Sequence, residues 1–249
     1  MSNQLLPITK LPVGAVPASV LVCGDPARAE KTAGFLQNPR LLSQNREYHS
    51  YIGEFQGEEV LVCSHGVGSA GAAIAFEELV AAGAKRMVRI GTCGGIMPKV
   101  KDGDLVIATS AIANIGYVQE TVPPYFPAVA DVELSMALRS SADAAQYGRP
   151  VHMGMVITRD TFYGGLNTFL TPSYDLLAQA NVLAVEMECA ALFVVGALRQ
   201  VATAAILAVD GNVLNTPESM DDYQPHREVV HEAVTAEIEI ALAALVALK

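Results

Sequence analysis

Continuous apolar runs, rather than alternating apolar and polar positions, recur along the chain. Several of them end in Gly-rich turns, which indicates strands that feed into loops or helices. Strands that are apolar on both sides are typical of a sheet that is covered on both faces. The runs predict strands over residues 19–23, 60–64, 86–90, 105–113, 151–158 and 202–209.

Helical patterns separate these runs. The turn GDPARAE follows the first strand and opens a helix, and Gly83 is the expected stop of a helix that begins after HGVGSAG. Further helices are predicted over residues 188–198 and 227–248. No linker, repeat or change of composition divides the chain. Residues 1–249 are therefore predicted to form one α/β domain, with three α/β/α layers around a mostly parallel, mixed central sheet.

Composition supports a large buried core, because 51% of the residues are hydrophobic and 17% are charged. No run of about 18 uncharged apolar residues occurs, and the N-terminal segment lacks the pattern of a signal peptide. We therefore expect a cytoplasmic protein, in which the widely spaced Cys23, Cys63, Cys93 and Cys189 are buried free thiols. The formal net charge of -10 argues against nucleic acid and anionic membranes as partners.

Ligands of open α/β sheets bind beyond the carboxyl ends of the strands, so the residues that follow each run are candidates for chemistry. GVGSAG, at residues 66–71, matches the pattern GxGxxG between a strand and a helix. A dinucleotide site would also have an acidic residue at the end of the next strand, where this chain has Arg89, Ile90 and Gly91. This argues against NAD or FAD, although the glycines still allow some ligand to approach the backbone.

Two turns carry the features of an anion site. Gly24 and Arg28 open one helix, and Arg89 and Thr92 flank a second Gly-rich turn. Backbone N–H groups, a hydroxyl and two guanidinium groups together suit a tetrahedral oxyanion. A surface ion pair is the alternative for either arginine alone. It fits Arg89 less well, because an uncompensated charge within a strand would be costly.

Acidic and aromatic residues follow other apolar segments. Glu186 and Glu188 could accept hydrogen bonds from a sugar diol, or satisfy backbone donors at a helix N-terminus. Because positions two apart on a helix face different directions, at most one is expected to reach a ligand directly. Asp210 ends a strand before a Gly and is either a turn residue or a partly desolvated general acid. Phe162 and Tyr163 are either core aromatics or a platform for a flat base.

These segments together resemble the purine nucleoside phosphorylase and uridine phosphorylase family, and most closely its hexameric purine nucleoside phosphorylases. The resemblance runs from about residue 20 to the C-terminal helix. Each matching segment is short, but their order along the chain makes the pattern specific. The segments are GDPAR (24–28), NREY (45–48), SHGVGSAG (64–71), EELVAAGAK (77–85), RIGTCGG (89–95), DTFY (160–163), VEMECA (185–190) and AVDGN (208–212).

The resemblance implies phosphorolytic cleavage of the N-glycosidic bond of a purine nucleoside, with inorganic phosphate as co-substrate and no metal or organic cofactor. It implies a homohexamer, a trimer of dimers, in which Arg46 crosses a dimer interface to a neighbouring subunit. Asp210 would be the general acid toward the purine N7, assisted by Arg227. The implied ligands are Gly24, Arg28, Arg46, Arg89 and Thr92 for phosphate, Val67, Met187 and Glu188 for ribose, and Cys93, Gly94, Phe162, Val185 and Asp210 for the base.

One difference from the uridine phosphorylases and two departures from the family pattern stand out. Uridine phosphorylases carry a Gln and an Arg that bind uracil, where this chain has Leu166 and Thr168, and this loss favours a purine. The N-terminal His that reaches the ribose 5′-hydroxyl in many relatives is replaced near Pro7 and Ile8, so a 5′-methylthio group could be tolerated. The loop after Asp210 is unlike other versions. The alternatives are a methylthioadenosine phosphorylase or nucleosidase, a uridine phosphorylase, and a non-catalytic nucleoside sensor.

Overall fold

The computed structural model describes residues 4–214, 224 and 227–248. Within them, ten strands form one mixed sheet. The strands are β1 (Ser19–Cys23), β2 (Gln37–Asn45), β3 (Tyr48–Phe55), β4 (Glu58–Ser64), β5 (Arg86–Gly95), β6 (Leu105–Asn114), β7 (Ala128–Val129), β8 (Val151–Arg159), β9 (Ala184–Glu186) and β10 (Ala202–Asn212). The helices are α1 (Pro26–Ala33), α2 (Ser69–Ala82), α3 (Gly116–Thr121), α4 (Val132–Ala145), α5 (Tyr174–Gln179), α6 (Cys189–Arg199) and α7 (Glu228–Ala247).

One part of the sheet closes on itself. The strand order is β10-β6-β8-β9-β5-β1-β4-β3-β2, and β10 also pairs with β5, so the strands from β10 to β5 form a ring. At the junction, β5 pairs in parallel with both β1 and β10, and β1 pairs in parallel with β4. Antiparallel pairs join β10 to β6 and link β2, β3 and β4 into a meander. The sheet is therefore mixed, with a parallel centre.

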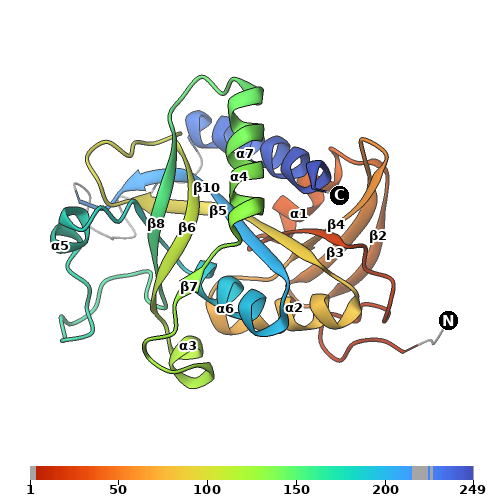
Figure 1. The fold of residues 1–249 in the computed structure, drawn as a ribbon, viewed down its shortest axis with the longest axis horizontal. Helices are drawn as coiled ribbons and strands as arrows, with labels where there is room; N and C mark the ends of the chain where they lie inside the picture. The colour runs from red at the N-terminus through yellow and green to blue at the C-terminus, as the bar shows by residue number, and fades with distance from the viewer. Residues whose placement is uncertain (1–3, 215–223, 225–226, 249) are drawn as a thin grey trace.

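Helices cover both faces of the sheet (Figure 1). α1, α4 and α7 pack on one face, in a core that includes Leu242 of α7. α2, α3 and α6 cover the other face, in a core that includes Phe76 and Phe193. Leu21 of β1 lies in the first core and Val22 in the second, which is why this strand is apolar at consecutive positions. The predicted three-layer α/β/α organisation is confirmed.

The strands predicted from the apolar runs are all present, and several extend further at their C-terminal ends. β5 continues beyond Ile90 to Gly95, and β10 continues beyond Val209 to Asn212. These extensions are rich in Gly, which gives no strand signal in the sequence. The helices predicted over residues 188–198 and 227–248 are also present, with ends that differ slightly from the predicted ones.

The apolar runs do not predict the β2–β3 hairpin or α4. β2 is mostly exposed, and β3 largely alternates, with Tyr48 and Ile52 buried, so neither has the continuous apolar pattern of a central strand. α4 does carry a helix signal. The side chain of Asp131 caps it by accepting a hydrogen bond from the Leu134 N–H at 2.8 Å, and Leu134 and Leu138 form its buried stripe.

The parallel centre brings the C-terminal ends of β1, β4, β5 and β10 to one edge of the sheet. In the pairing of β10 with β5, Val209 lies opposite Cys93 and Gly211 opposite Gly94, so Asp210 falls at an irregularity in the register. A bulge of this kind turns a side chain away from the regular up-and-down pattern. Asp210 is thereby presented at the edge where the neighbouring strands end.

Two further predictions concern the described part of the chain. All four cysteines are buried and free, as expected. No helix of this part is long and apolar enough to cross a membrane. The loop that follows Asp210 and departs from the family pattern lies mostly outside the described residues.

Candidate active site

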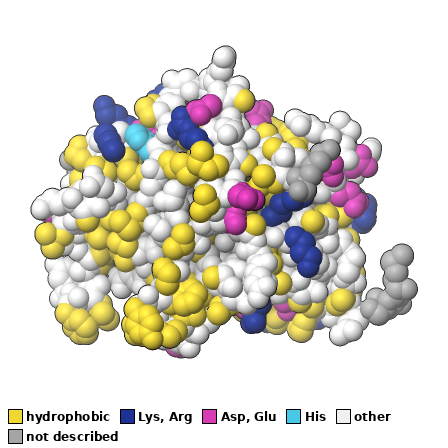
Figure 2. Space-filling model, viewed as in Figure 1, with side chains coloured by type: hydrophobic (Ala, Val, Ile, Leu, Met, Phe, Trp, Pro, Cys, Tyr) yellow, Lys and Arg dark blue, Asp and Glu magenta, His cyan; other side chains and the backbone are white. Residues whose placement is uncertain are grey.

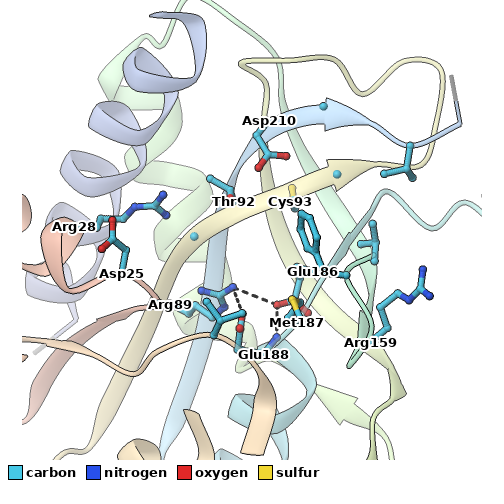
Figure 3. A pocket seen from close by; sticks show the side chains of 18 of the residues that line it. Asp25, Arg28, Arg89, Thr92, Cys93, Arg159, Glu186, Met187, Glu188 and Asp210 are labelled. Carbon is cyan, nitrogen blue, oxygen red and sulfur yellow. Dashed lines mark hydrogen bonds and ion pairs between the residues drawn. The ribbon is translucent and has the colours of Figure 1, made fainter. Parts of the chain in front are cut away.

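A cavity of about 910 Å³ opens where β1, β4, β5 and β10 end. This volume is in the range of small-molecule sites. Figure 3 shows Arg28 and Arg89 on one side of it, Asp210 above and Arg159 across from the arginines. Every predicted site residue except Arg46 lines the cavity, namely Gly24, Arg28, Val67, Arg89, Thr92, Cys93, Gly94, Phe162, Val185, Met187, Glu188, Asp210 and Arg227.

The start of α1 forms one rim of the cavity. Asp25 caps this helix, because its side chain accepts a hydrogen bond from the Ala27 N–H at 2.8 Å. Gly24 packs closely against the turn after β4, where a Cβ at position 24 would lie 3.2 Å from the Gly66 carbonyl oxygen. The Arg28 side chain is 18% exposed and lines the cavity from the first turn. A cation is therefore placed at a helix N-terminus, which already favours anions.

Arg89 is buried in β5, and its side chain folds back over the next residues of the strand. A Cβ at Gly91 would lie 2.4 Å from Arg89 Nη1, so this placement of the guanidinium depends on the absence of a side chain there. Nη2 pairs with Glu188 and lies 3.5 Å from Glu186 Oε2, while Nε has no hydrogen-bond partner among the described residues. Burial disfavours the charged form, but Glu188 and other nearby acidic groups outweigh it and raise the pKa of Arg89. The site thus holds a charged, largely desolvated guanidinium.

Glu186 and Glu188 divide the roles considered for them in the sequence analysis. Glu186 Oε2 accepts hydrogen bonds from the N–H groups of Glu188 at 2.7 Å and Cys189 at 2.9 Å, at the start of α6. Glu188 accepts from the Gly68 N–H at 2.6 Å and from Arg89. Burial raises the pKa of Glu188, although Arg89 opposes this. Glu186 therefore satisfies backbone donors, and Glu188 is the better candidate for a ligand contact.

A third buried glutamate, Glu237, lies behind the part of the cavity that Arg28 and Arg89 line, which we call the anion end. The sequence pattern did not single out this residue. Its side chain is fully buried, with Oε1 3.6 Å from Arg28 Nη1 and Oε2 3.3 Å from the Gly91 nitrogen. Burial raises its pKa to about 8, against the opposing effect of Arg28. The signal available in the sequence was an acidic residue within the largely apolar helix at residues 227–248.

Asp210 is 6% exposed at the bulge of β10. Arg227, which precedes α7, donates from Nη2 to the backbone oxygen of Asp210 at 2.7 Å and pairs through Nη1 with Asp102. Arg227 thus lies next to Asp210, and it donates to the main-chain oxygen of that residue. Asp102 was missed, since it lies in a polar turn before β6 that carries no functional pattern. A catalytic role for Arg227 stays a prediction.

The opposite end of the cavity is mostly apolar. Phe162 is 41% exposed and packs edge-on against Tyr163, with ring centroids 5.1 Å apart. Val185 and Cys93 line the same cavity. Arg159 also lines the cavity, where it lies at the end of β8 and donates from Nη1 to the Tyr174 hydroxyl. It was missed because it follows an apolar run as a single charge, without a recognisable motif.

His65 adds no positive charge to this region. Burial, together with Arg89 and Arg28, lowers its pKa to about 3 despite a bond to the Gly66 carbonyl. Among the described residues, no group of three or more His, Cys, Asp or Glu is placed to hold a metal ion. Arg28 and Arg89 are the positively charged side chains that line this part of the cavity beside His65.

Arg46 is the one predicted site residue that the structure leaves elsewhere. It lies exposed in the turn between β2 and β3, with φ of 53°, and does not line the cavity of its own chain. Its contribution to a neighbouring subunit stays a prediction. On the face drawn in Figure 2, Lys and Arg side chains occur in separate spots rather than in one basic patch, which gives no sign of a nucleic-acid surface there.

Comparisons with known proteins agree with this geometry. A model of the phosphorylase superfamily matches residues 19–247. The uridine phosphorylase of Treponema pallidum is 40% identical over 83% of this chain and 82% of that protein, and the purine nucleoside phosphorylase of Plasmodium vivax is 35% identical over 97% and 96%. The crystal structure of purine nucleoside phosphorylase from Toxoplasma gondii in complex with immucillin-H has a TM-score of 0.90 and 31% identity, covering 100% of this chain and 98% of that one. The chain therefore belongs to the phosphorylase superfamily, in the family of purine nucleoside and uridine phosphorylases.

Proposed function

We propose that this protein cleaves purine nucleosides with inorganic phosphate, releasing the free base and ribose 1-phosphate or deoxyribose 1-phosphate. The observation that carries the proposal is that Arg28 and Arg89 line one cavity together with Glu188 and Asp210. The guanidinium groups of Arg28 and Arg89 suit a phosphate. The carboxylate of Glu188 suits a sugar diol, and the carboxyl group of Asp210 suits protonation of a leaving group. These are the groups that phosphorolysis requires.

The substrates would lie across the cavity in a fixed order. Phosphate would occupy the end beside Arg28 and Arg89, with Gly24 and Thr92 completing its contacts. Glu188 would accept hydrogen bonds from the ribose hydroxyls. The sugar would pack against Val67 and Met187, and the base would lie among Cys93, Gly94, Phe162 and Val185.

The buried pair of Arg89 and Glu188 has a direct consequence for binding. Without substrates each of these charges satisfies the other, which avoids leaving a buried charge unpaired. In the bound state, the Arg89 guanidinium would pair with the phosphate, and the Glu188 carboxylate would accept hydrogen bonds from the sugar hydroxyls. The two substrates would therefore favour each other's binding, since each leaves one member of the pair available to the other.

The reaction follows from this arrangement. As the bond between C1′ and the base nitrogen stretches, positive charge develops on the sugar, and the phosphate dianion beneath it stabilises that charge. A phosphate oxygen then bonds to C1′, while the electron pair of the broken bond goes to the base. Asp210 donates its proton to N7 of the departing purine, and such general acid catalysis typically contributes about 10²–10⁴-fold.

A purine is favoured over uracil by the loop that follows β8. Leu166 and Thr168 stand where uracil-binding residues would be, and neither lines the cavity. Leu166 is 92% exposed. A site that hydrogen-bonds a substrate discriminates strongly, so the loss of both polar groups should make uridine a poor substrate. Asp210 supplies instead a proton donor suited to the purine N7.

Uridine phosphorolysis is the second candidate, because the 40% identical relative from Treponema pallidum is named uridine phosphorylase. Arg159, which lines the cavity together with Phe162 and Val185, is a polar group that could contact a pyrimidine carbonyl there. Cleavage of methylthioadenosine, which carries a methylthio group in place of the 5′-hydroxyl, remains an alternative. Hydrolysis without phosphate is disfavoured, because it would give the arginines no anion to bind.

A substrate panel separates these possibilities. Inosine, guanosine, adenosine, methylthioadenosine and uridine are each incubated with and without phosphate, and base release is followed. We expect purine nucleosides to be cleaved only with phosphate and uridine to be cleaved poorly. Equal rates without phosphate would indicate a nucleosidase, and efficient uridine cleavage would overturn the interpretation of Leu166 and Thr168.

We also propose that the active unit contains at least two chains, with Arg46 of one reaching the phosphate in the cavity of the next, as in a homohexamer. The test is complementation between inactive variants. Arg46→Ala and Asp210→Asn chains are each assayed alone and then after mixed assembly. Mixed assemblies should regain activity, because some sites combine an intact Asp210 with a neighbour's intact Arg46. Activity of Arg46→Ala alone at the wild-type level would contradict this.

A further inference from the structure

The C-terminal helix α7 places one acidic side chain behind the anion end of the cavity. Glu237 is fully buried, whereas Glu239, on the same helix, is exposed. One oxygen of Glu237 is 3.6 Å from Nη1 of Arg28, and the other accepts a hydrogen bond from the Gly91 N–H at 3.3 Å. Glu237 does not itself line the cavity. Its carboxyl group therefore links α7 to both α1 and β5 from the side opposite the ligand.

The charges that face Glu237 come from two elements. Arg28 of α1 and Arg89 of β5 both favour its ionised form. Cys93 of β5 and Tyr147, which follows α4, are further titratable groups that interact with it. Burial raises the pKa of both, so they are neutral. Apart from backbone N–H groups of β5 and β10, the described surroundings of the Glu237 charge are thus the two arginines expected to bind phosphate.

We propose that Glu237 is a positioning residue that shares Arg28 with the substrate phosphate, so that phosphate binding is coupled to protonation of Glu237. This inference rests on the proposed function, because it takes phosphate to bind at Arg28 and Arg89. An ionised Glu237 pairs with Arg28, which weakens the attraction between Arg28 and phosphate, and it also repels a nearby dianion. A protonated Glu237 carries no charge, so Arg28 attracts the phosphate fully and the repulsion is absent.

The direction of the pH effect follows from burial. The buried carboxyl has a pKa of about 8 in the absence of phosphate. A bound dianion disfavours its charged form further, so phosphate binding takes up a proton at this pH. By linkage, phosphate binds more tightly where Glu237 is protonated. The KM for phosphate should therefore be lowest below about pH 8 and should rise above it, approaching a tenfold change per pH unit.

The test compares the wild type with Glu237→Gln and with the matched control Glu239→Gln. The control removes one negative charge from the exposed side of the same helix. Phosphate KM and kcat are measured for inosine cleavage from about pH 7 to about pH 9.5. The KM is expressed as the concentration of phosphate dianion, because inorganic phosphate itself titrates at the lower end of this range. Wild type and control should show the rise in phosphate KM above pH 8, and Glu237→Gln should show a flat profile with kcat little changed. A Glu237→Gln enzyme that keeps the wild-type rise would overturn the inference.

A second measurement uses the wild type alone, in case the variant does not fold. Calorimetric titration with inorganic phosphate at about pH 8, in two buffers of different ionisation enthalpy, counts the protons exchanged on binding. Uptake of a fraction of a proton supports the coupling, and no uptake overturns it. Nucleoside cleavage that proceeds equally without phosphate would instead overturn the proposed function, so the two failures are distinguishable.

Discussion

Replacing Gly91 with Ala should impair the use of phosphate while leaving a folded enzyme of lower stability. The added methyl group would lie 2.4 Å from Nη1 and 2.8 Å from Cζ of Arg89, well inside van der Waals contact. The atoms that it meets belong to the end of a flexible side chain, so the strain is relieved by displacing the guanidinium, which also weakens its buried pair with Glu188. Arg89 would then leave the anion end of the cavity. A hydrogen bond to a charged group contributes about 1.5–3 kcal/mol, which predicts a rise in phosphate KM of about 10- to 150-fold.

The assay is a phosphate titration at saturating inosine, accompanied by thermal melting of each variant. Gly211→Ala is the matched control, because Gly211 also lines the cavity and an added Cβ there has nothing within 4 Å. The control should keep a phosphate KM close to that of the wild type. A folded Gly91→Ala enzyme with a wild-type phosphate KM would refute the reasoning, since displacement of Arg89 would then have no effect on phosphate.

Three further predictions concern single side chains. Asp210→Asn should lower kcat about 10²–10⁴-fold in steady-state assays with little change in phosphate KM, and an unchanged kcat would exclude Asp210 as the acid. Glu188→Ala leaves Arg89 without its closest partner, so denaturant melts should show a loss of about 3–5 kcal/mol, and unchanged stability would argue against the buried pair. Glu237 has a pKa raised from 4.5 to about 8, so its stabilisation of the fold, relative to Glu237→Gln, is complete below pH 4.5. This stabilisation should fall by at most roughly 5 kcal/mol as the pH rises to about 8. Plots of stability against pH that run parallel for the wild type and Glu237→Gln would contradict this.

Much of the central sheet was predictable from the sequence because its strands are buried on both faces. Leu21 and Val22 lie in different cores, and burial on both sides produces the continuous apolar runs that identify such strands. The residues after those runs were then candidates for the site, and the structure brings Arg28, Arg89 and Asp210 to one cavity. The physical basis is that parallel strands end at a common edge.

Edge and surface elements were less predictable. β2 is exposed over most of its length, so its sequence carries little hydrophobic signal. The Gly-rich ends of β5 and β10 are strands because they pair with each other, not because their residue types favour extended backbone. α4 does carry a local helix signal, because Asp131 caps its N-terminus and apolar residues form a buried stripe along it.

Long-range pairs explain why the surroundings of the site could not be derived in full. Glu237 and Glu239 are separated by a single residue in a helix, and only the packing of α7 on the sheet decides which one is buried beside Arg28. In the same way, Arg227 meets Asp102 across 125 positions of the chain. No local pattern encodes such partners, since each depends on how distant elements dock.

A crystal structure of the protein with inorganic phosphate would show whether the two arginines bind the anion. We expect one tetrahedral anion contacted by the guanidinium groups of Arg28 and Arg89 and by Thr92. Arg89 should then have moved its charge from Glu188 toward the anion. Arginines that remain on Glu237 and Glu188, with phosphate bound elsewhere or not at all under conditions in which nucleosides are cleaved, would contradict it.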